Sequence, residues 1–243
     1  MEKGILKQSI LKIKKQYWLL LGMSALVSAS SLLVNYLIIS ILPLSGLEDF
    51  ETLVRFFLLA LVMSLYIGAF FISFADVFIR VARSEDVSFP MLFTGFKTDY
   101  GRSVGLYLFM YIKLYLWSLL LVVPGLVMSY AYKMSYFIAV ENPHYTAGEA
   151  IQESIKMMDG HKGRLFGLHL SLIPFYSPTI LFFVFAIIAH THGNSLTQML
   201  FTALSCICAL FVVPLINSVN ANFYLMLKDK YVKADGVQPN AIQ

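Results

Sequence analysis

The chain has 243 residues, of which 58% are hydrophobic and 13% are charged, and its formal net charge is +4. A globular domain carries about 25% charged residues, so this composition predicts a protein that crosses a membrane several times. The length leaves no room for a separate soluble catalytic domain beside five or six spans; we expect the lipid bilayer as the partner, and no nucleic acid.

The first segment is basic and precedes a long apolar run. No charged residue lies between Tyr17 and Leu47, whereas residues 1–16 contain Lys3, Lys7, Lys12, Lys14 and Lys15. A secretory signal has an apolar core of only about 7 to 15 residues, so the run 17–42 predicts an uncleaved first membrane helix. We expect a basic N-terminus at 1–16, one transmembrane domain at 17–227 and a tail at 228–243.

Basic residues cluster in four places along the chain. They lie before residue 17, at 80–102, at 156–164 and after residue 227. The predicted loop 43–52 instead holds three acids, and the predicted turn 190–195 holds no formal charge. By the positive-inside rule the basic groups are cytoplasmic. We therefore predict a multi-pass protein of the bacterial cytoplasmic membrane with both termini in the cytoplasm.

The further apolar runs predict the remaining membrane helices, at 53–79, 104–123, 126–140, 165–189 and 199–227. Pro124 and Gly125 break the run 104–140, because proline lacks a backbone donor and glycine permits a positive φ. Residues 126–140 would span only about 22 Å as a helix, against a hydrocarbon core of about 30 Å. We predict an all-α transmembrane bundle of about six helices with a broken hairpin. The alternative is five helices with a re-entrant or otherwise irregular element.

Two connections predict amphipathic helices on the cytoplasmic side. In 146–159, Thr146 and Glu149 have the spacing of a capping box, and Gly160 follows the last turn. The segment 88–97 has a mainly aromatic side. Packing against the bundle and binding of lipid both explain this pattern.

Several polar residues lie inside predicted spans, where a cation costs at least about 2.5 to 3.5 kcal/mol. Lys113 lies among aromatic residues, with Asp76 as a candidate partner, and Lys133 lies in the short limb. Asn217 and Asn220 follow a proline in the last span, an arrangement that transporters use to build sites near the middle of the membrane. These five residues are the candidates for contact with a ligand or ion.

No catalytic, metal or cofactor motif is recognisable. We therefore expect a non-enzymatic protein without cofactors, which transports or binds a small or lipid-like molecule, or serves export of or immunity to membrane-active peptides. The first alternative is a structural or assembly protein without a ligand. The second is an enzyme acting on lipid head groups through Glu149, Glu153, His161 and Lys162. The sequence leaves the oligomeric state open.

One block of residues carries a resemblance. The pattern comprises Pro124-Gly125, Glu141-Asn142-Pro143, Ala147-x-Glu149-Ala-Ile151 and Met157-Met-x-Gly160-His161-Lys162. It resembles a bacterial family of integral membrane proteins of unknown function. The family commonly has a lysine three residues after Pro-Gly, where this chain has Met128 and carries Lys133 instead. The resemblance also implies a distant likeness to the membrane domain of some glycerophosphodiester phosphodiesterases.

Overall fold

The computed structural model describes residues 2–41, 50–97 and 100–234. Every regular element in these residues is a helix, which confirms the all-α prediction. The predicted acidic loop lies mostly outside the described residues, as does the end of the tail. The elements are α1 (Glu2–Lys14), α2 (Tyr17–Ile41), α3 (Phe50–Ala82), η1 (Phe89–Phe93), α4 (Thr94–Lys97), α5 (Tyr100–Leu120), α6 (Val122–Ala131), α7 (Ser135–Glu141), α8 (Ala147–Met157), α9 (Lys162–Leu170), α10 (Ile173–Thr191) and α11 (Ser195–Ala234).

Five helices of the described chain are long and apolar enough to cross a membrane: α2, α3, α5, α10 and α11. This is one fewer than the favoured six. The difference lies in the second limb of the predicted hairpin, where α6 has only ten residues and a length of about 15 Å. A turn at Tyr132–Met134 then separates α6 from α7. The limb is therefore irregular, as in the five-helix alternative.

The break between α5 and α6 lies three residues before the predicted position. Leu121 is extended, with φ −167° and ψ 152°, and α6 begins at Val122. Pro124 lies in the first turn of α6, where its missing N–H leaves no bond unmade. Gly125 has no positive φ. Its role is close approach, because a Cβ there would lie 2.6 Å from Oγ of Ser118 on α5.

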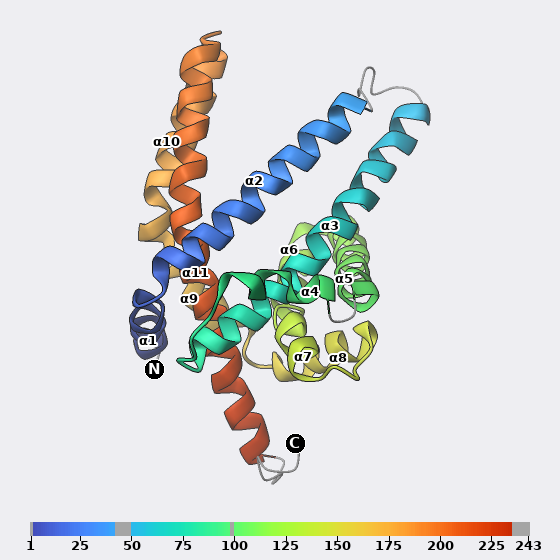
Figure 1. Ribbon diagram of the computed structural model, residues 1–243, viewed down its shortest axis with the longest axis vertical. Helices are drawn as coiled ribbons and strands as arrows, with labels where there is room; N and C mark the ends of the chain where they lie inside the picture. Colours follow the sequence, from blue (N-terminus) through green and yellow to red (C-terminus); the bar gives the residue numbers. More distant parts are fainter. Residues whose placement is uncertain (1, 42–49, 98–99, 235–243) are drawn as a thin grey trace.

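Apart from α5, the long helices form two pairs that lean apart (Figure 1). The α2–α3 pair extends toward one side of the molecule, whereas α10 packs along the upper part of α11. The basic N-terminus is itself a helix, α1, which packs on α11 and α3. Its residues Ile5, Ser9 and Ile13 are buried. The start of α1 and the end of α11 both lie in the lower part of the view.

The predicted fifth span is divided in the structure. Residues from Leu165 to Leu170 belong to α9, and a turn at Ser171 and Leu172 precedes α10, which starts at Ile173. The span therefore begins eight residues later than the apolar run indicates. Helix α9 consequently lies outside the membrane-spanning helices.

The capping box of α8 is present as predicted. The hydroxyl of Thr146 accepts a hydrogen bond from the backbone N–H of Glu149, whose carboxylate accepts one from the backbone N–H of Thr146 at 2.7 Å. Gly160, with φ +67°, terminates this segment. The predicted helix 88–97 is divided into η1 and α4. The ring of Phe96 in α4 packs edge-on against the ring of Phe70 in α3. Phe96 and the buried Leu92 therefore face the bundle, whereas Phe89 and Phe93 are exposed.

Candidate ligand-binding cavity

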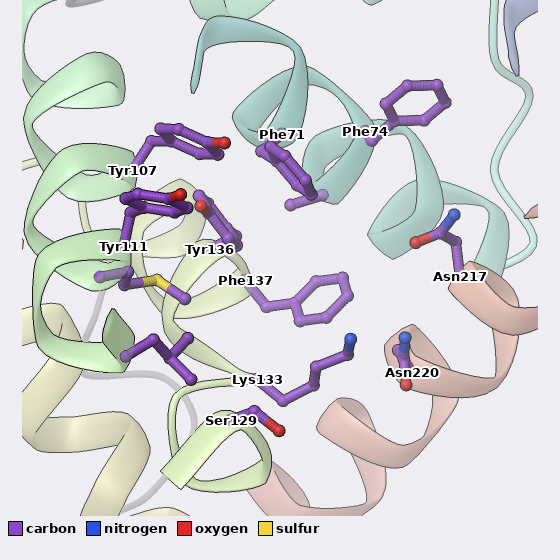
Figure 2. Close-up of a pocket in the computed structure, with 13 residues that line it drawn as sticks. Phe71, Phe74, Tyr107, Tyr111, Ser129, Lys133, Tyr136, Phe137, Asn217 and Asn220 are labelled. Atoms are coloured by element: carbon purple, nitrogen blue, oxygen red, sulfur yellow. The ribbon is translucent and has the colours of Figure 1, made fainter. Parts of the chain in front are cut away.

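A cavity of about 260 Å³ lies between α3, α5, α11 and the segment that joins α6 to α7 (Figure 2). We call it the Lys133 cavity. Three of the five predicted contact residues line it: Lys133, Asn217 and Asn220. The fold thus brings Lys133 together with two asparagines that lie more than 80 residues later in the sequence.

One wall of the Lys133 cavity consists of aromatic rings. The ring of Phe71 from α3 stacks on Tyr107 of α5, at 5.5 Å between centroids, and on Tyr136 of α7, at 5.1 Å. Tyr107 also stacks on Tyr111 at 6.2 Å. Phe137 lies between these rings and the asparagines (Figure 2). This wall offers apolar ring faces to the body of a ligand.

The opposite side carries the ammonium group of Lys133. Its side chain extends from the turn after α6 into the space between Phe137 and Asn220 (Figure 2). Within the described residues, Nζ has no hydrogen-bond or ion-pair partner. The residue is exposed to the space of the cavity, and partial desolvation by the protein atoms nearby lowers the pKa of Lys133. The cavity therefore contains a cation without a matching anion.

Two side chains outside the lining of the cavity, His169 and Tyr130, form a series of hydrogen bonds that orients Asn220. Oδ1 of Asn220 lies 2.9 Å from Nε2 of His169 in α9, and Nδ1 of His169 lies 3.1 Å from the hydroxyl of Tyr130 in α6. A neutral imidazole with its proton on Nε2 satisfies both contacts, since Tyr130 then donates to Nδ1. Asn220 uses its oxygen in this series of hydrogen bonds, which leaves its NH₂ group for the cavity. The amide of Asn217 donates to the carbonyl of Val213 at 3.0 Å.

Burial lowers the pKa of His169 from its ordinary value of 6.5, and the nearby charge of Lys133 lowers it further. The hydrogen bond with Asn220 acts in the opposite direction. The imidazole is therefore neutral near pH 7. Sequence reasoning missed both Tyr130 and His169. His169 could have been noticed as the histidine at the start of the apolar run 165–189, but we predicted that run to be a membrane span.

Lys113 and Asp76 lie outside the lining of the cavity, and the predicted pair between them is wrong. Nζ of Lys113 lies 4.4 Å from the ring centroid of Phe109, one helical turn away. The carboxylate of Asp76 instead accepts a hydrogen bond from Nε of Arg80 at 2.9 Å. Arg80 is four residues from Asp76 on the same helix, so Asp76 has a partner within α3 and does not need Lys113 of α5.

The block from Glu141 to Pro143 has a structural role. The carboxylate of Glu141 is 9% exposed and accepts hydrogen bonds from Tyr224 at 2.5 Å, from Lys228 at 2.6 Å and from Arg83. These contacts connect the end of α7 to α3 and α11. The amide of Asn142 caps α7 by donating to Ile138, and the guanidinium of Arg102 donates to the carbonyls of Ala139, Asn142, Pro143 and Tyr145.

The four residues predicted for chemistry on lipid head groups do not line the Lys133 cavity, and both glutamates have partners close to them in sequence. Glu149 is held in the capping box, and Glu153 pairs with Lys156 at 3.4 Å. His161 occupies the position before α9, which Lys162 begins. Hydrogen bonding to Thr146 lowers the pKa of Glu149, so this carboxyl group is ionised near neutral pH and is a poor general acid.

A family model described as "Protein of unknown function (DUF975)" matches residues 119–231, a little under half of the chain. The matched region includes Lys133, His169, Asn217, Asn220 and the block at 141–162. No match was found among the curated proteins or the solved structures. The expected likeness to glycerophosphodiester phosphodiesterases therefore stays a prediction. The chain is a helical membrane protein whose second half is similar to a family of unknown function.

Proposed function

We propose that this membrane protein binds a compact anionic molecule with an apolar part in the Lys133 cavity. Lys133 and the NH₂ group of Asn220 contact the anionic group, and the rings of Phe71, Tyr107 and Tyr136 contact the apolar part. The observation that carries the proposal is the unpartnered ammonium of Lys133. The finer predictions of transport, and of export or immunity for membrane-active peptides, stay predictions.

The contrast with other lysines supports this role. Lys113 lies over an aromatic ring, and Lys228 has the carboxylate of Glu141 at 2.6 Å. Both are thus compensated by the protein itself, as is expected of structural lysines near apolar surroundings. Lys133 lacks such compensation among the described residues. A bound anion would supply it.

The size of the cavity limits the ligand. Pockets for drug-sized molecules have volumes of about 300 to 1,000 Å³, and the Lys133 cavity has about 260 Å³. It therefore suits a head group or a small amphiphile better than an entire two-chain phospholipid. The side chain of His169 supports the site by orienting Asn220.

We also propose that the protein is not an enzyme and that both termini lie in the cytoplasm of a bacterial cell. With five spanning helices, this orientation requires that α5 and the irregular limb α6–α7 together enter and leave the membrane on the same side. Support for the first comes from the local engagement of Glu149 and Glu153. Support for the second comes from the basic residues at both ends and from the positions of α1 and the end of α11 in Figure 1.

Native mass spectrometry of the full-length protein, purified from cell membranes in mild detergent, tests the binding proposal. The wild type should retain an anionic molecule, and Lys133→Met should lose it. Lys113→Met is the matched control, because it removes an intramembrane lysine outside the cavity, and it should retain the molecule. Equal retention by Lys133→Met and the wild type, with both folded by circular dichroism, would contradict the proposal.

A further inference from the structure

A second, larger cavity lies on another side of the molecule, where the junction of α1 and α2 faces α10 and α11. Its volume is about 660 Å³. Lys14, Tyr17 and Trp18 line one part of it, and Phe175, Val212 and Leu215 are among the apolar residues that line the rest. We call it the Lys14 groove. It shares no lining residue with the Lys133 cavity.

Lys14 differs from the neighbouring lysines in having no partner. Lys12 donates to the carbonyl of Ala82 and to Asn222, the latter at 3.0 Å, and Lys15 pairs with Asp86 at 2.8 Å. Within the described residues, Lys14 makes no hydrogen bond or ion pair, and its side chain is exposed. The groove therefore carries a free cation.

The aromatic residues beside Lys14 mark the entry of the chain into the membrane. Trp18 is 75% exposed on the first turn of α2, the first membrane-spanning helix. Tyr17 donates a hydrogen bond to the carbonyl of Phe211 on α11 at 2.7 Å. Tryptophan and tyrosine are enriched at the level of the lipid head groups. The Lys14 end of the groove thus lies at the membrane surface, and its apolar walls on α10 and α11 extend toward the hydrocarbon.

We infer that the Lys14 groove binds an anionic phospholipid from the surrounding bilayer. The lysine contacts the phosphate, and an acyl chain lies along Phe175, Val212 and Leu215. The negative phosphate of such a lipid complements the charge of Lys14, and its acyl chain complements the apolar walls of the groove. The volume of the groove lies in the range of small-molecule sites. The inference is independent of the ligand proposed for the Lys133 cavity.

The chain contains two tryptophans, which makes a direct test feasible. In a Trp117→Phe background, Trp18 is the remaining tryptophan, and brominated lipid in contact with it quenches its fluorescence. The protein is reconstituted in vesicles of phosphatidylcholine with increasing amounts of brominated phosphatidylglycerol, or of brominated phosphatidylcholine. The anionic lipid should quench Trp18 at the lower mole fraction.

Lys14→Gln should reduce this preference for the anionic lipid about fivefold, which is the factor that corresponds to one lysine near a membrane surface. Lys7→Gln is the matched control, because Lys7 is exposed on the same helix and does not line the groove, and it should leave the preference unchanged. Equal effects of the two substitutions would show only a general surface charge and would overturn the inference.

Two further variants make the result specific. Val212→Phe fills the groove and should reduce quenching by both lipids, with a thermal melt to confirm the fold. Lys133→Met should leave the lipid preference of Trp18 unchanged. Loss of the preference in Lys133→Met, or its persistence in Lys14→Gln, would overturn the Lys14 groove as the lipid site.

Discussion

Nε2 of His169 lies 2.9 Å from Oδ1 of Asn220, although 51 residues separate the two along the chain. The contact connects α9 to α11 directly behind the Lys133 cavity. It fixes which atom of the Asn220 amide faces the cavity, and it places an imidazole close to an unpartnered ammonium. The site therefore depends on the protonation state of His169.

Acidification should destabilise the protein through His169. Burial and the charge of Lys133 lower the folded-state pKa below 6.5, so the unfolded state binds more protons between these two pKa values. Stability from the neutral imidazole is present above pH 6.5 and is lost as the pH falls through this window. Thermal melts from pH 7.5 to 5 should show a larger loss for the wild type than for His169→Gln. Parallel curves would contradict the prediction.

Replacing Lys113 should have little effect on stability. Lys113→Met removes a cation–π contact worth about 0.5 to 1 kcal/mol, and it also relieves the cost of keeping a cation near apolar surroundings. A double-mutant cycle with Asp76→Asn, measured by denaturant unfolding in detergent, should give no coupling, because Asp76 pairs with Arg80. Coupling above about 0.5 kcal/mol would restore the pair predicted from the sequence.

Removing the charge of Glu141 should destabilise the contacts between α7, α3 and α11. In Glu141→Gln the cations of Arg83 and Lys228 lose their shared anion, at a cost of about 1 to 3 kcal/mol, with both cations partly exposed to solvent screening. Asp86→Asn is the control, since it breaks the exposed pair with Lys15 and should cost less than about 1 kcal/mol. Denaturant unfolding of the two variants would measure the difference, and equal losses would argue against a special role for Glu141.

The capping box should control the local stability of α8. Thr146→Ala removes the acceptor for the backbone N–H of Glu149 and should cost about 0.5 to 2 kcal/mol. Amide hydrogen exchange should therefore accelerate from Glu149 through Ile151. Gln152→Ala, on the exposed side of the same helix, should leave these amides unchanged. Unaltered exchange in Thr146→Ala would show that the cap contributes nothing.

Cysteine labelling should establish the orientation in the membrane. In a background with Cys206 and Cys208 replaced by serine, Asn194→Cys should react with an impermeant thiol reagent in intact cells. Ser84→Cys and Gln152→Cys should react only after permeabilisation, because basic residues mark their connections as cytoplasmic. Labelling of Ser84→Cys in intact cells would reverse the proposed orientation.

The sequence by itself determined the class of fold and most of the membrane helices, because long uncharged runs have few stable alternatives outside a bilayer. It also determined the cap of α8, since Thr146 and Glu149 interact within one helical turn. Local spacing is sufficient for such features. It was insufficient for the break at Leu121, which depends on how closely α6 approaches Ser118 at Gly125.

Only the tertiary structure decided which polar residues share a site. Lys133, Asn217 and Asn220 were candidates from the sequence. The two asparagines lie three residues apart on one helix, but nothing local related them to Lys133 or to the rings of Phe71 and Tyr136. The approach of α11 to the turn after α6 brings them together, whereas Asp76 finds its partner, Arg80, within its own helix. Contacts between helices depend on side-chain packing across the whole bundle, so residues distant in sequence acquire a common function only when the helices are assembled.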